Sequence, residues 1–278
     1  MEAFPLQLTR VVTLSIALAC LLAGVAAGAQ SAGTQSEGPA LLERLSEAAR
    51  HNRAAAEKFL FEEDIVRVAA SSSGERTLGR RTYEVSFLEG ENYYRLIGEN
   101  GSPLSIDDEM AEQERLVRVE RHRKKTPLEK RRKIAAKEER NRLKFDLESL
   151  ARTHSATVVG SETINSREVA VVDIAPAGKI RKPKNRNEWG RILAGRLWLD
   201  NETGYPLRAE MKQLVEWDLQ PAGNRTTFDW ILMDGAWLIS SIRNSEPAAG
   251  GGTLITKQTY SSYSRFQAES KLTYTELP

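Results

Sequence analysis

The sequence predicts an α+β fold: a curved antiparallel sheet, or incomplete β-barrel, of about nine strands, with an N-terminal helix and an inserted helical hairpin. Three observations carry this prediction. Apolar and polar residues alternate along stretches of the C-terminal half, which is typical of strands with one dry and one wet face. An amphipathic stretch with helical periodicity precedes the first strand. A long charged segment without strand periodicity, residues 104–154, interrupts the strands.

The composition excludes several classes of protein. The chain has 278 residues, of which 40% are hydrophobic and 28% are charged, with a formal net charge of +2. This balance excludes a protein made of many membrane spans and a wholly disordered protein. Because the net charge is small, an anionic partner would have to be bound by a local patch.

Neither a metal site nor an active site is recognisable in the sequence. The 3 His residues are far apart, the chain has 1 Cys, and neither a nucleophile motif nor a phosphate-binding loop is present. We therefore expect a protein that is not an enzyme and that uses no cofactor and no metal.

The first 29 residues have the features of a cleavable signal peptide. One Arg precedes the apolar run Val11–Val25, and the Ala-Gly-Ala stretch at 27–29 is a typical cleavage signal. The run is shorter than the roughly 20 residues of a membrane span, although an uncleaved anchor is an alternative. Cys20 could carry a lipid, as in an outer-membrane lipoprotein, but apolar residues continue beyond it. We expect a periplasmic protein.

The remaining chain is expected to form a single half-barrel-like domain over 39–278, after a flexible lead-in at 30–38. An amphipathic helix is predicted at 39–60, and such a helix normally packs onto the dry face of a sheet. The predicted strands follow the turn residues and the two-residue alternation. The candidate segments, of which about nine are expected to be full strands and 270–275 is a last short segment, are 61–70, 81–88, 92–98, 157–163, 168–174, 191–200, 206–219, 225–233, 236–244, 253–266 and 270–275.

The segment 104–154 is predicted to be a helical hairpin inserted between strands. Ser105 is a good N-cap, and three acidic residues follow it in the first turn, where the helix dipole favours anions. The stretch 126–129 is a capping box with Pro at the first helical position. It predicts a second helix that continues to about His154.

The segment Arg196–Arg208 resembles the strand–turn–strand of periplasmic lipoprotein carriers of the LolA/LolB type. The residues that carry the resemblance are Trp198, Asp200, Thr203, Gly204 and Pro206. The N-terminal domain of RseB is a relative of these carriers. The resemblance implies an incomplete antiparallel barrel whose concave side is covered by an N-terminal helix and an internal helical segment, and it implies a carrier role.

Apolar residues of the predicted meander could line a cavity for an acyl chain. The alternative is that they form an ordinary core beneath the N-terminal helix. The candidates are Leu207, Met211, Val215, Trp217, Phe228 and Trp230.

Basic residues gather at the expected tip of the hairpin, where they could contact an anionic membrane surface or an acidic protein. The alternative is a solvated hairpin without a partner. Nucleic acid is not an expected partner, because no aromatic residue lies in the cluster to stack on bases. The cluster contains Arg118, Arg121, Arg123, Lys124, Lys125, Arg131 and Arg132.

Two functions therefore remain open. The first is an exported, non-enzymatic carrier that holds a lipid or a lipoprotein acyl chain between the sheet and the helices. The second is a structural or interaction protein of the cell envelope, with a filled core and a basic hairpin that contacts an anionic partner.

Overall fold

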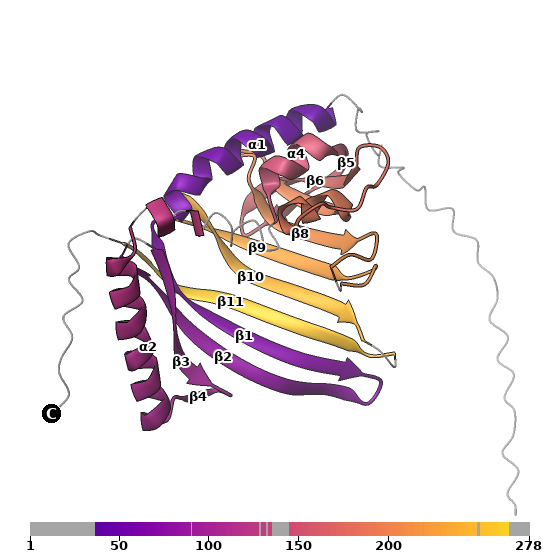
Figure 1. The fold of residues 1–278 in the computed structure, drawn as a ribbon. Coiled ribbons are helices and arrows are strands. Elements are labelled where there is room, and N and C mark those ends of the chain that lie inside the picture. Colours follow the sequence, from indigo (N-terminus) through magenta and orange to yellow (C-terminus); the bar gives the residue numbers. More distant parts are fainter. Residues whose placement is uncertain are drawn as a thin grey trace, which may run out of the picture. The chain divides into compact units, whose positions relative to one another are not determined.

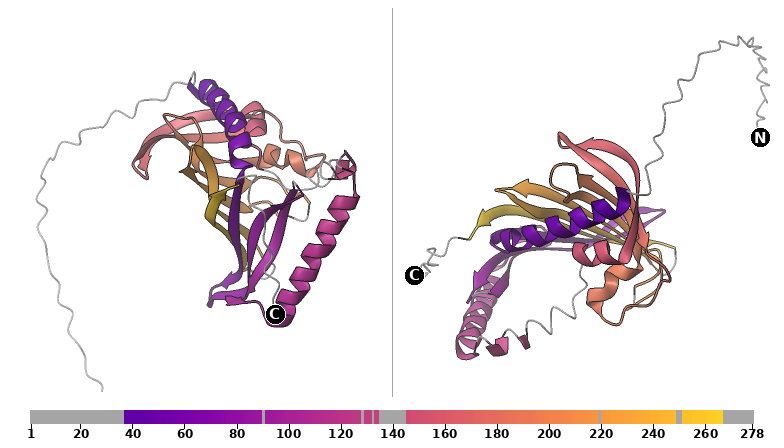
Figure 2. Two further views of the ribbon diagram at one scale, coloured as in Figure 1. Left: turned by 90° about the vertical axis from the view of Figure 1, so that its left-hand side faces the viewer. Right: turned by 90° about the horizontal axis from the view of Figure 1, so that it is seen from above.

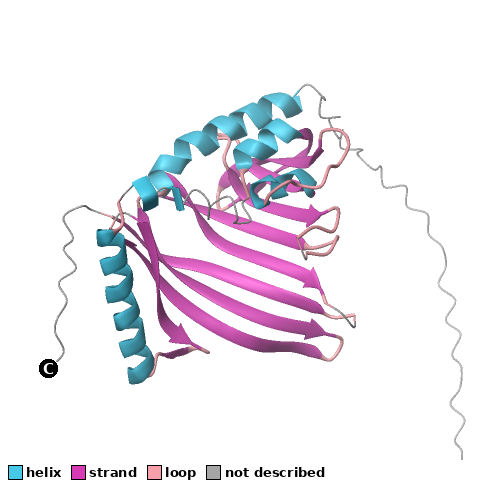
Figure 3. Cartoon of the chain, viewed as in Figure 1, coloured by secondary structure: helices cyan, strands magenta, loops and turns pink. Residues whose placement is uncertain are grey.

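Eleven antiparallel strands form one continuous sheet in the computed structural model (Figures 1 and 3). The structure describes residues 37–89, 91–127, 129–131, 133–134, 145–218, 220–248 and 251–266, and these belong to one compact unit, Gly33–Pro278. The strand order is β4-β3-β2-β1-β11-β10-β9-β8-β7-β6-β5, so β4 and β5 are the edges and the sheet is open. The predicted α+β class with an incomplete antiparallel barrel is confirmed, with 11 strands rather than about nine.

The elements follow the chain in an order close to the predicted one. β4 was not predicted, whereas the predicted strand 270–275 lies outside the described residues, as do the predicted signal peptide and most of the lead-in. The bounds are α1 (Glu37–Ala56), β1 (Phe59–Ser71), β2 (Gly74–Leu88), β3 (Glu91–Glu99), β4 (Ser102–Pro103), α2 (Ile106–Lys125), α4 (Leu147–Thr153), β5 (His154–Ile164), β6 (Arg167–Pro176), the 3-10 helix η1 (Arg186–Ile192), β7 (Leu193–Asp200), β8 (Pro206–Gln213), β9 (Arg225–Met233), β10 (Ala236–Pro247) and β11 (Thr253–Arg265).

Helices α1 and α4 pack beside each other on one face of the sheet (Figure 2). Leu42 and Leu45 of α1 and Leu150 of α4 are buried in the main core, which confirms the predicted amphipathic helix. The prediction was wrong at its C-terminal end, because the helix ends at Ala56 and Phe59 and Leu60 already belong to β1. The two backbones approach closely where α1 begins, since a Cβ added at Gly38 would lie 2.1 Å from the carbonyl oxygen of Ala156 in β5. No helix among the described residues is long and apolar enough to span a membrane.

Helix α2 packs on the opposite face of the sheet. Tyr93 and Tyr94 are successive residues of β3, so their side chains point to opposite faces. Tyr94 lies on the side of α1, whereas Tyr93 is buried with Leu88 and with Leu116 of α2. Leu116 is the one buried residue of α2, so the helix has too narrow an apolar stripe to cover more than the edge of the sheet. The resemblance implied that the internal helical segment lies on the same face as the N-terminal helix; α4 lies beside α1, whereas α2 does not.

The structure describes only the two ends of the predicted hairpin over 104–154, which are α2 and α4. Helix α2 contacts β3, whereas α4 contacts α1, η1 and β5, so the two helices lie against different parts of the sheet rather than side by side. Residues 129–131 and 133–134 are helical, but 128, 132 and 135–144 lie outside the described residues. The prediction of one helix continuing to about His154 was wrong, because residues 145–146 are not helical and α4 begins anew with Asp146 as its N-cap, accepting from the backbone N–H of Glu148 at 3.2 Å. The tip of the hairpin stays a prediction.

Strand β8 ends earlier than the sequence alternation predicts. The strand stops at Gln213, and the following turn is closed by two backbone hydrogen bonds between Trp217 and Gln220, of 3.0 and 2.9 Å. The buried Gln213 side chain organises this turn, because it accepts from Trp189 Nε1 at 2.9 Å and donates to the carbonyls of Val215 and Gln220 at 3.0 Å. The prediction of a strand over 206–219 was therefore wrong at its C-terminal end.

Candidate functional site: an apolar groove beneath helix α1

An open groove of about 450 Å³ lies between α1, the start of α4 and the sheet. Its floor is aromatic. Phe228 and Trp230 of β9 lie two residues apart and share one face of the sheet, and Trp237 of β10 adjoins them. Phe145, which precedes α4, stacks on Phe228 with ring centroids 4.2 Å apart, and Tyr205 stacks on Trp237 at 5.8 Å. The floor is therefore the aromatic upper layer of the main core, and Phe228, Trp230, Trp237 and Tyr205 are each only 5–7% exposed there.

The side of the groove formed by α1 consists of small residues held at a fixed height. Ala49 and Ala56 line it, one turn before and one turn after Asn52. The Asn52 side chain accepts from the backbone N–H of Trp237 at 2.7 Å and donates to the carbonyl of Trp237 at 2.8 Å. This pair of hydrogen bonds fixes the distance between α1 and β10. The space beside the small side chains of Ala49 and Ala56 is therefore a fixed feature of the structure.

The other end of the groove is formed by tyrosines from β3 and β11 and by Phe61 of β1. Tyr260 and Tyr263 both contact the ring of Phe61, with centroids 5.6 Å apart. Tyr260 is also hydrogen-bonded to Glu63, a carboxylate that is only 7% exposed. Burial raises the pKa of Glu63, and burial together with the neighbouring carboxylate raises the pKa of Tyr260. At this end, aromatic rings line the groove, and the hydrogen-bonded pair of Tyr260 and Glu63 lies behind them.

The six predicted ligand residues separate into two groups. Phe228 and Trp230 are each 5% exposed and belong to the main core, and they also line the groove. Leu207 and Met211 are buried in the same core, and Val215 and Trp217 pack against it from the turn after β8, but none of these four lines the groove. The alternative interpretation, ordinary core, therefore describes these four fully and describes the buried part of Phe228 and Trp230.

Sequence reasoning did not single out Phe61, Tyr205, Trp237, Tyr260 and Tyr263. Alternation within β1, β10 and β11 indicates which of their residues share a face, but it does not indicate which strands are neighbours. The groove exists because β1 pairs with β11, which brings Glu63 beside Gln258, 195 residues away in the chain. A turn-based prediction of local hairpins contains no signal for this pairing.

Several members of the predicted basic cluster are engaged within the fold. Arg123 donates to the backbone carbonyls of Leu88, Glu91 and Asn92 at 2.8 to 3.0 Å. Arg131 donates to the Glu91 carboxylate at 3.0 Å. These two residues fasten the turn between β2 and β3 and are not a free contact patch.

The remaining basic residues differ in their contacts. Arg118 pairs with Glu114 at 3.4 Å, and Lys124 pairs with Glu120, in each case one turn apart on α2. Arg121 and Lys125 are exposed and form no ion pair with any residue that the structure describes. Arg132 lies outside the described residues. A free basic surface at this place is therefore smaller than the sequence predicts.

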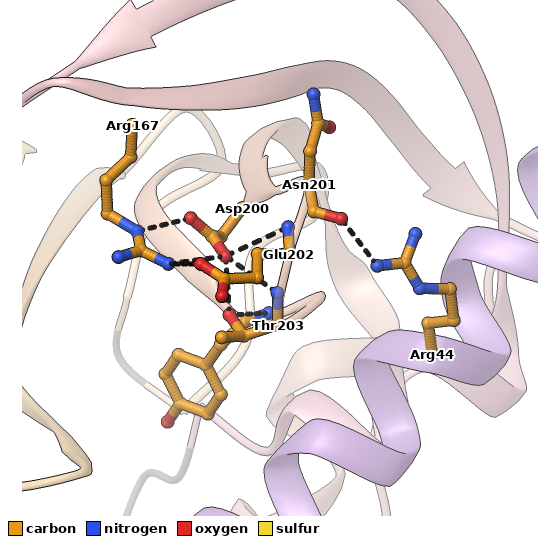
Figure 4. A network of polar contacts seen from close by, with 7 residues as sticks. Arg44, Arg167, Asp200, Asn201, Glu202 and Thr203 are labelled. Carbon is orange, nitrogen blue, oxygen red and sulfur yellow. Dashed lines mark hydrogen bonds and ion pairs between the residues drawn. The ribbon is translucent and has the colours of Figure 1, made fainter.

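A polar network holds the turn between β7 and β8 against α1 (Figure 4). Asp200, which is 1% exposed, accepts from Arg167 Nε at 2.5 Å and from the backbone N–H of Thr203 at 2.7 Å. Arg44 of α1 donates to the carbonyl of Asn201 at 2.9 Å. The segment that carries the family resemblance is thus a structural turn that positions α1 over the sheet.

No group of three or more potential metal ligands is found among the described residues. His154 is the one buried His among the described residues. Its Nε2 is 2.9 Å from the carbonyl oxygen of Leu193. Burial lowers its pKa, which favours the neutral ring. Its contacts are those of a structural residue between α4, β5 and β7.

Comparison with known proteins finds similarity to solved structures. No protein-family model and no curated protein matches the sequence. The chain is similar to a domain described as an outer membrane lipoprotein-sorting protein from Vibrio parahaemolyticus, with a TM-score of 0.38 and 13% identity over 86% of this chain and 95% of that chain. It is similar to a LolA superfamily protein from Nitrosomonas europaea, with a TM-score of 0.32 and 11% identity over 83% of this chain and 94% of that chain. It is also similar to the MucA/MucB complex of Pseudomonas aeruginosa, with a TM-score of 0.24 and 14% identity over 84% of this chain and 100% of that chain.

Proposed function

We propose that this protein is an exported, non-enzymatic binding or carrier module that holds the apolar part of a lipid or of a lipoprotein acyl chain. The observation that carries the proposal is the open groove beneath α1, of about 450 Å³ and with an aromatic floor. Protein cores are close-packed and contain few voids larger than a water molecule. Ligand sites, in contrast, are concave, mostly apolar and of roughly 300–1,000 Å³.

Export to the periplasm is part of the proposal and is supported by the sequence of residues 1–29. The apolar run followed by Ala-Gly-Ala is typical of a signal peptide. In the periplasm a groove that shields an apolar chain from water would let a lipid cross an aqueous compartment. A lipid anchor at Cys20 is not required for this role.

The alternative role, contact with an anionic membrane or an acidic protein through the basic residues of α2, has less support. Arg123 and Arg131 bind backbone or carboxylate oxygens of the β2–β3 turn. Only Arg121 and Lys125 of the predicted cluster stay unpaired among the described residues. The open groove also argues against a completely filled core.

Filling the groove tests the proposal. The uncharged probe N-phenyl-1-naphthylamine, which fluoresces in apolar surroundings, is titrated into the wild-type chain and into Ala49→Trp. Because Ala49 lines the groove, we expect the indole to occupy the space and to weaken probe binding at least about tenfold. Mass spectrometry of gently purified wild-type protein should also find bound lipid.

Ala54→Trp is the matched control, because Ala54 belongs to the same helix but is exposed. It should bind the probe as the wild type does, and both variants should keep the thermal unfolding midpoint within a few degrees. If the wild type does not bind the probe and carries no lipid, or if Ala49→Trp binds the probe normally, the proposed function is wrong.

A further inference from the structure

The charged residues around the groove are mainly acidic. Arg53, Glu57 and Asp146 line it. The positive charge of Arg53 is already matched by an ion pair with Glu148. Glu148 also pairs with Arg152 at 3.9 Å, and Asp146 caps α4 by accepting from the backbone N–H of Glu148 at 3.2 Å. Among the charged residues that line the groove, Glu57 and Asp146 outnumber Arg53, so the lining carries a small excess of negative charge.

A third carboxylate lies behind the tyrosine end of the groove. Glu63 is 7% exposed and takes hydrogen bonds from the hydroxyl of Tyr260 and from Gln258 Nε2, the latter at 3.3 Å. Among the described residues it forms no ion pair with Lys, Arg or His, and no cation contributes to its pKa. A buried carboxylate without a cation is costly, and such groups cluster at functional sites.

The placement of Glu63 connects it with the groove. Glu63 and Tyr260 are direct neighbours across the β1–β11 pair, so their side chains share one face of the sheet. Tyr260 itself lines the groove, together with Phe61, which precedes Glu63 by two residues and shares its face. A ligand that fills the groove as far as Tyr260 would therefore bring its end group to the hydroxyl that is hydrogen-bonded to the buried carboxyl group of Glu63.

We propose that the groove selects amphiphiles whose head is a cationic amine over those whose head is a carboxylate or a phosphate, with Tyr260 and Glu63 as the recognition pair at its tyrosine end. This inference rests on the proposed function, because it names the class of ligand that the same groove takes. An ammonium group would supply the cation that Glu63 lacks and would be attracted by Glu57 and Asp146. An anionic head would meet three carboxylates in surroundings where charge interactions are stronger than in water.

The test compares three ligands that share one apolar chain: dodecylamine, dodecanol and dodecanoate. Each is titrated at pH 7 against the full chain, dodecylamine and dodecanoate below their critical micelle concentrations and dodecanol below its solubility limit, and binding is measured by displacement of N-phenyl-1-naphthylamine. Because hydrogen bonds to charged groups are the stronger ones, we expect dodecylamine to bind about tenfold more tightly than dodecanol. Dodecanoate should bind more weakly than dodecanol.

Two substitutions locate the selectivity. Glu63→Gln keeps the shape of the side chain and removes its charge, so dodecylamine and dodecanol should then bind within about twofold of each other. Tyr260→Phe, which removes only the hydroxyl, should reduce the preference for the amine without abolishing probe binding. Glu62→Gln is the control, since Glu62 lies next in the strand and points to the other face.

The outcomes separate this inference from the proposed function. If dodecanoate binds as tightly as dodecylamine, or if Glu63→Gln keeps the amine preference, the inference is overturned while the groove remains a binding site. If neither the probe nor any of the three ligands binds the wild type, the proposed function itself fails and the inference fails with it.

Discussion

Two Arg–Asp pairs of similar geometry show how burial decides what a single residue contributes. Asp200 accepts from Arg167 at 2.5 and 3.1 Å, and Asp173 accepts from Arg196 at 2.7 and 3.1 Å. The side chain of Asp200 is 2% exposed, whereas that of Asp173 is 46% exposed. Burial alone would raise the pKa of Asp200, but donors from Arg167 and from Thr203 outweigh burial and lower it.

We expect Asp200→Asn to reduce the free energy of unfolding by about 1.5–3 kcal/mol at pH 7, because it removes the buried acceptor of charged hydrogen bonds from Arg167, which keeps only its pair with the exposed Glu202 at 2.8 Å. Asp173→Asn, the control, should cost less than about 1 kcal/mol, as exposed ion pairs do. Both are measured by urea denaturation.

The pH dependence of the Asp200 contribution has a definite sign. A carboxyl whose pKa is lowered in the folded state stabilises the fold above its unfolded pKa of about 3.9, and this stabilisation is lost as the pH falls through the folded pKa. The difference between the wild type and Asp200→Asn should therefore shrink below about pH 4. A difference that stays constant down to pH 2 would contradict the assignment.

At the scale of secondary structure, α1 is the element on which the groove depends. Its apolar stripe packs into the main core, Asn52 ties its middle to β10, and Arg44 ties it to the turn after β7. Its first turn touches β5 so closely that only a residue without a side chain fits at Gly38. The periodicity of the sequence predicts the helix, but it does not predict these three attachments.

We expect Gly38→Ala to destabilise the protein by about 1–3 kcal/mol, because the added methyl group meets the carbonyl of Ala156 and forces the two backbones apart. The shift should also weaken probe binding in the groove. Gly160→Ala in β5 is the control, since its Cβ would meet nothing within 4 Å, and it should change the stability by less than about 0.5 kcal/mol. Thermal unfolding and probe titration measure both effects, and equal behaviour of the two variants would contradict this account of how α1 docks.

At the scale of the whole described unit, the two faces of the sheet have different roles. The face beneath α1 and α4 holds the main core and the groove, whereas β8 and β9 present Arg208 and Asp229 as an ion pair on the other face. Helix α2 lies on that other face and buries only Leu116. Local stability within a protein follows buried apolar contact, so α1 and α2 should differ in how often they open.

Hydrogen exchange followed by mass spectrometry checks this difference. Backbone amides of α2 should exchange faster than those of α1, since α1 has several buried residues and α2 has one. A saturating groove ligand should slow exchange in α1 and β10 and leave α2 unchanged. Equal protection of both helices by the ligand would place the binding site elsewhere.

The local pattern of the sequence was enough for the class of fold, for α1 and for most of the strands, because alternation and helical periodicity report which side of each element is dry. It was also enough to indicate that Phe228 and Trp230 face the interior. It could not show that β8 ends at Gln213, since the apolar pattern continues to Trp217 while the Gln213 side chain stabilises a turn instead.

Only the tertiary structure decided which part of the dry face is core and which part is groove. That distinction depends on the pairing of β1 with β11 and on the height at which Asn52 holds α1, and both join residues far apart in the chain. Only the tertiary structure also shows that Arg123 binds the turn between β2 and β3 and that Glu63 lies next to Tyr260, which lines the groove. A side chain's neighbours across a sheet are set by long-range register, which no local pattern encodes.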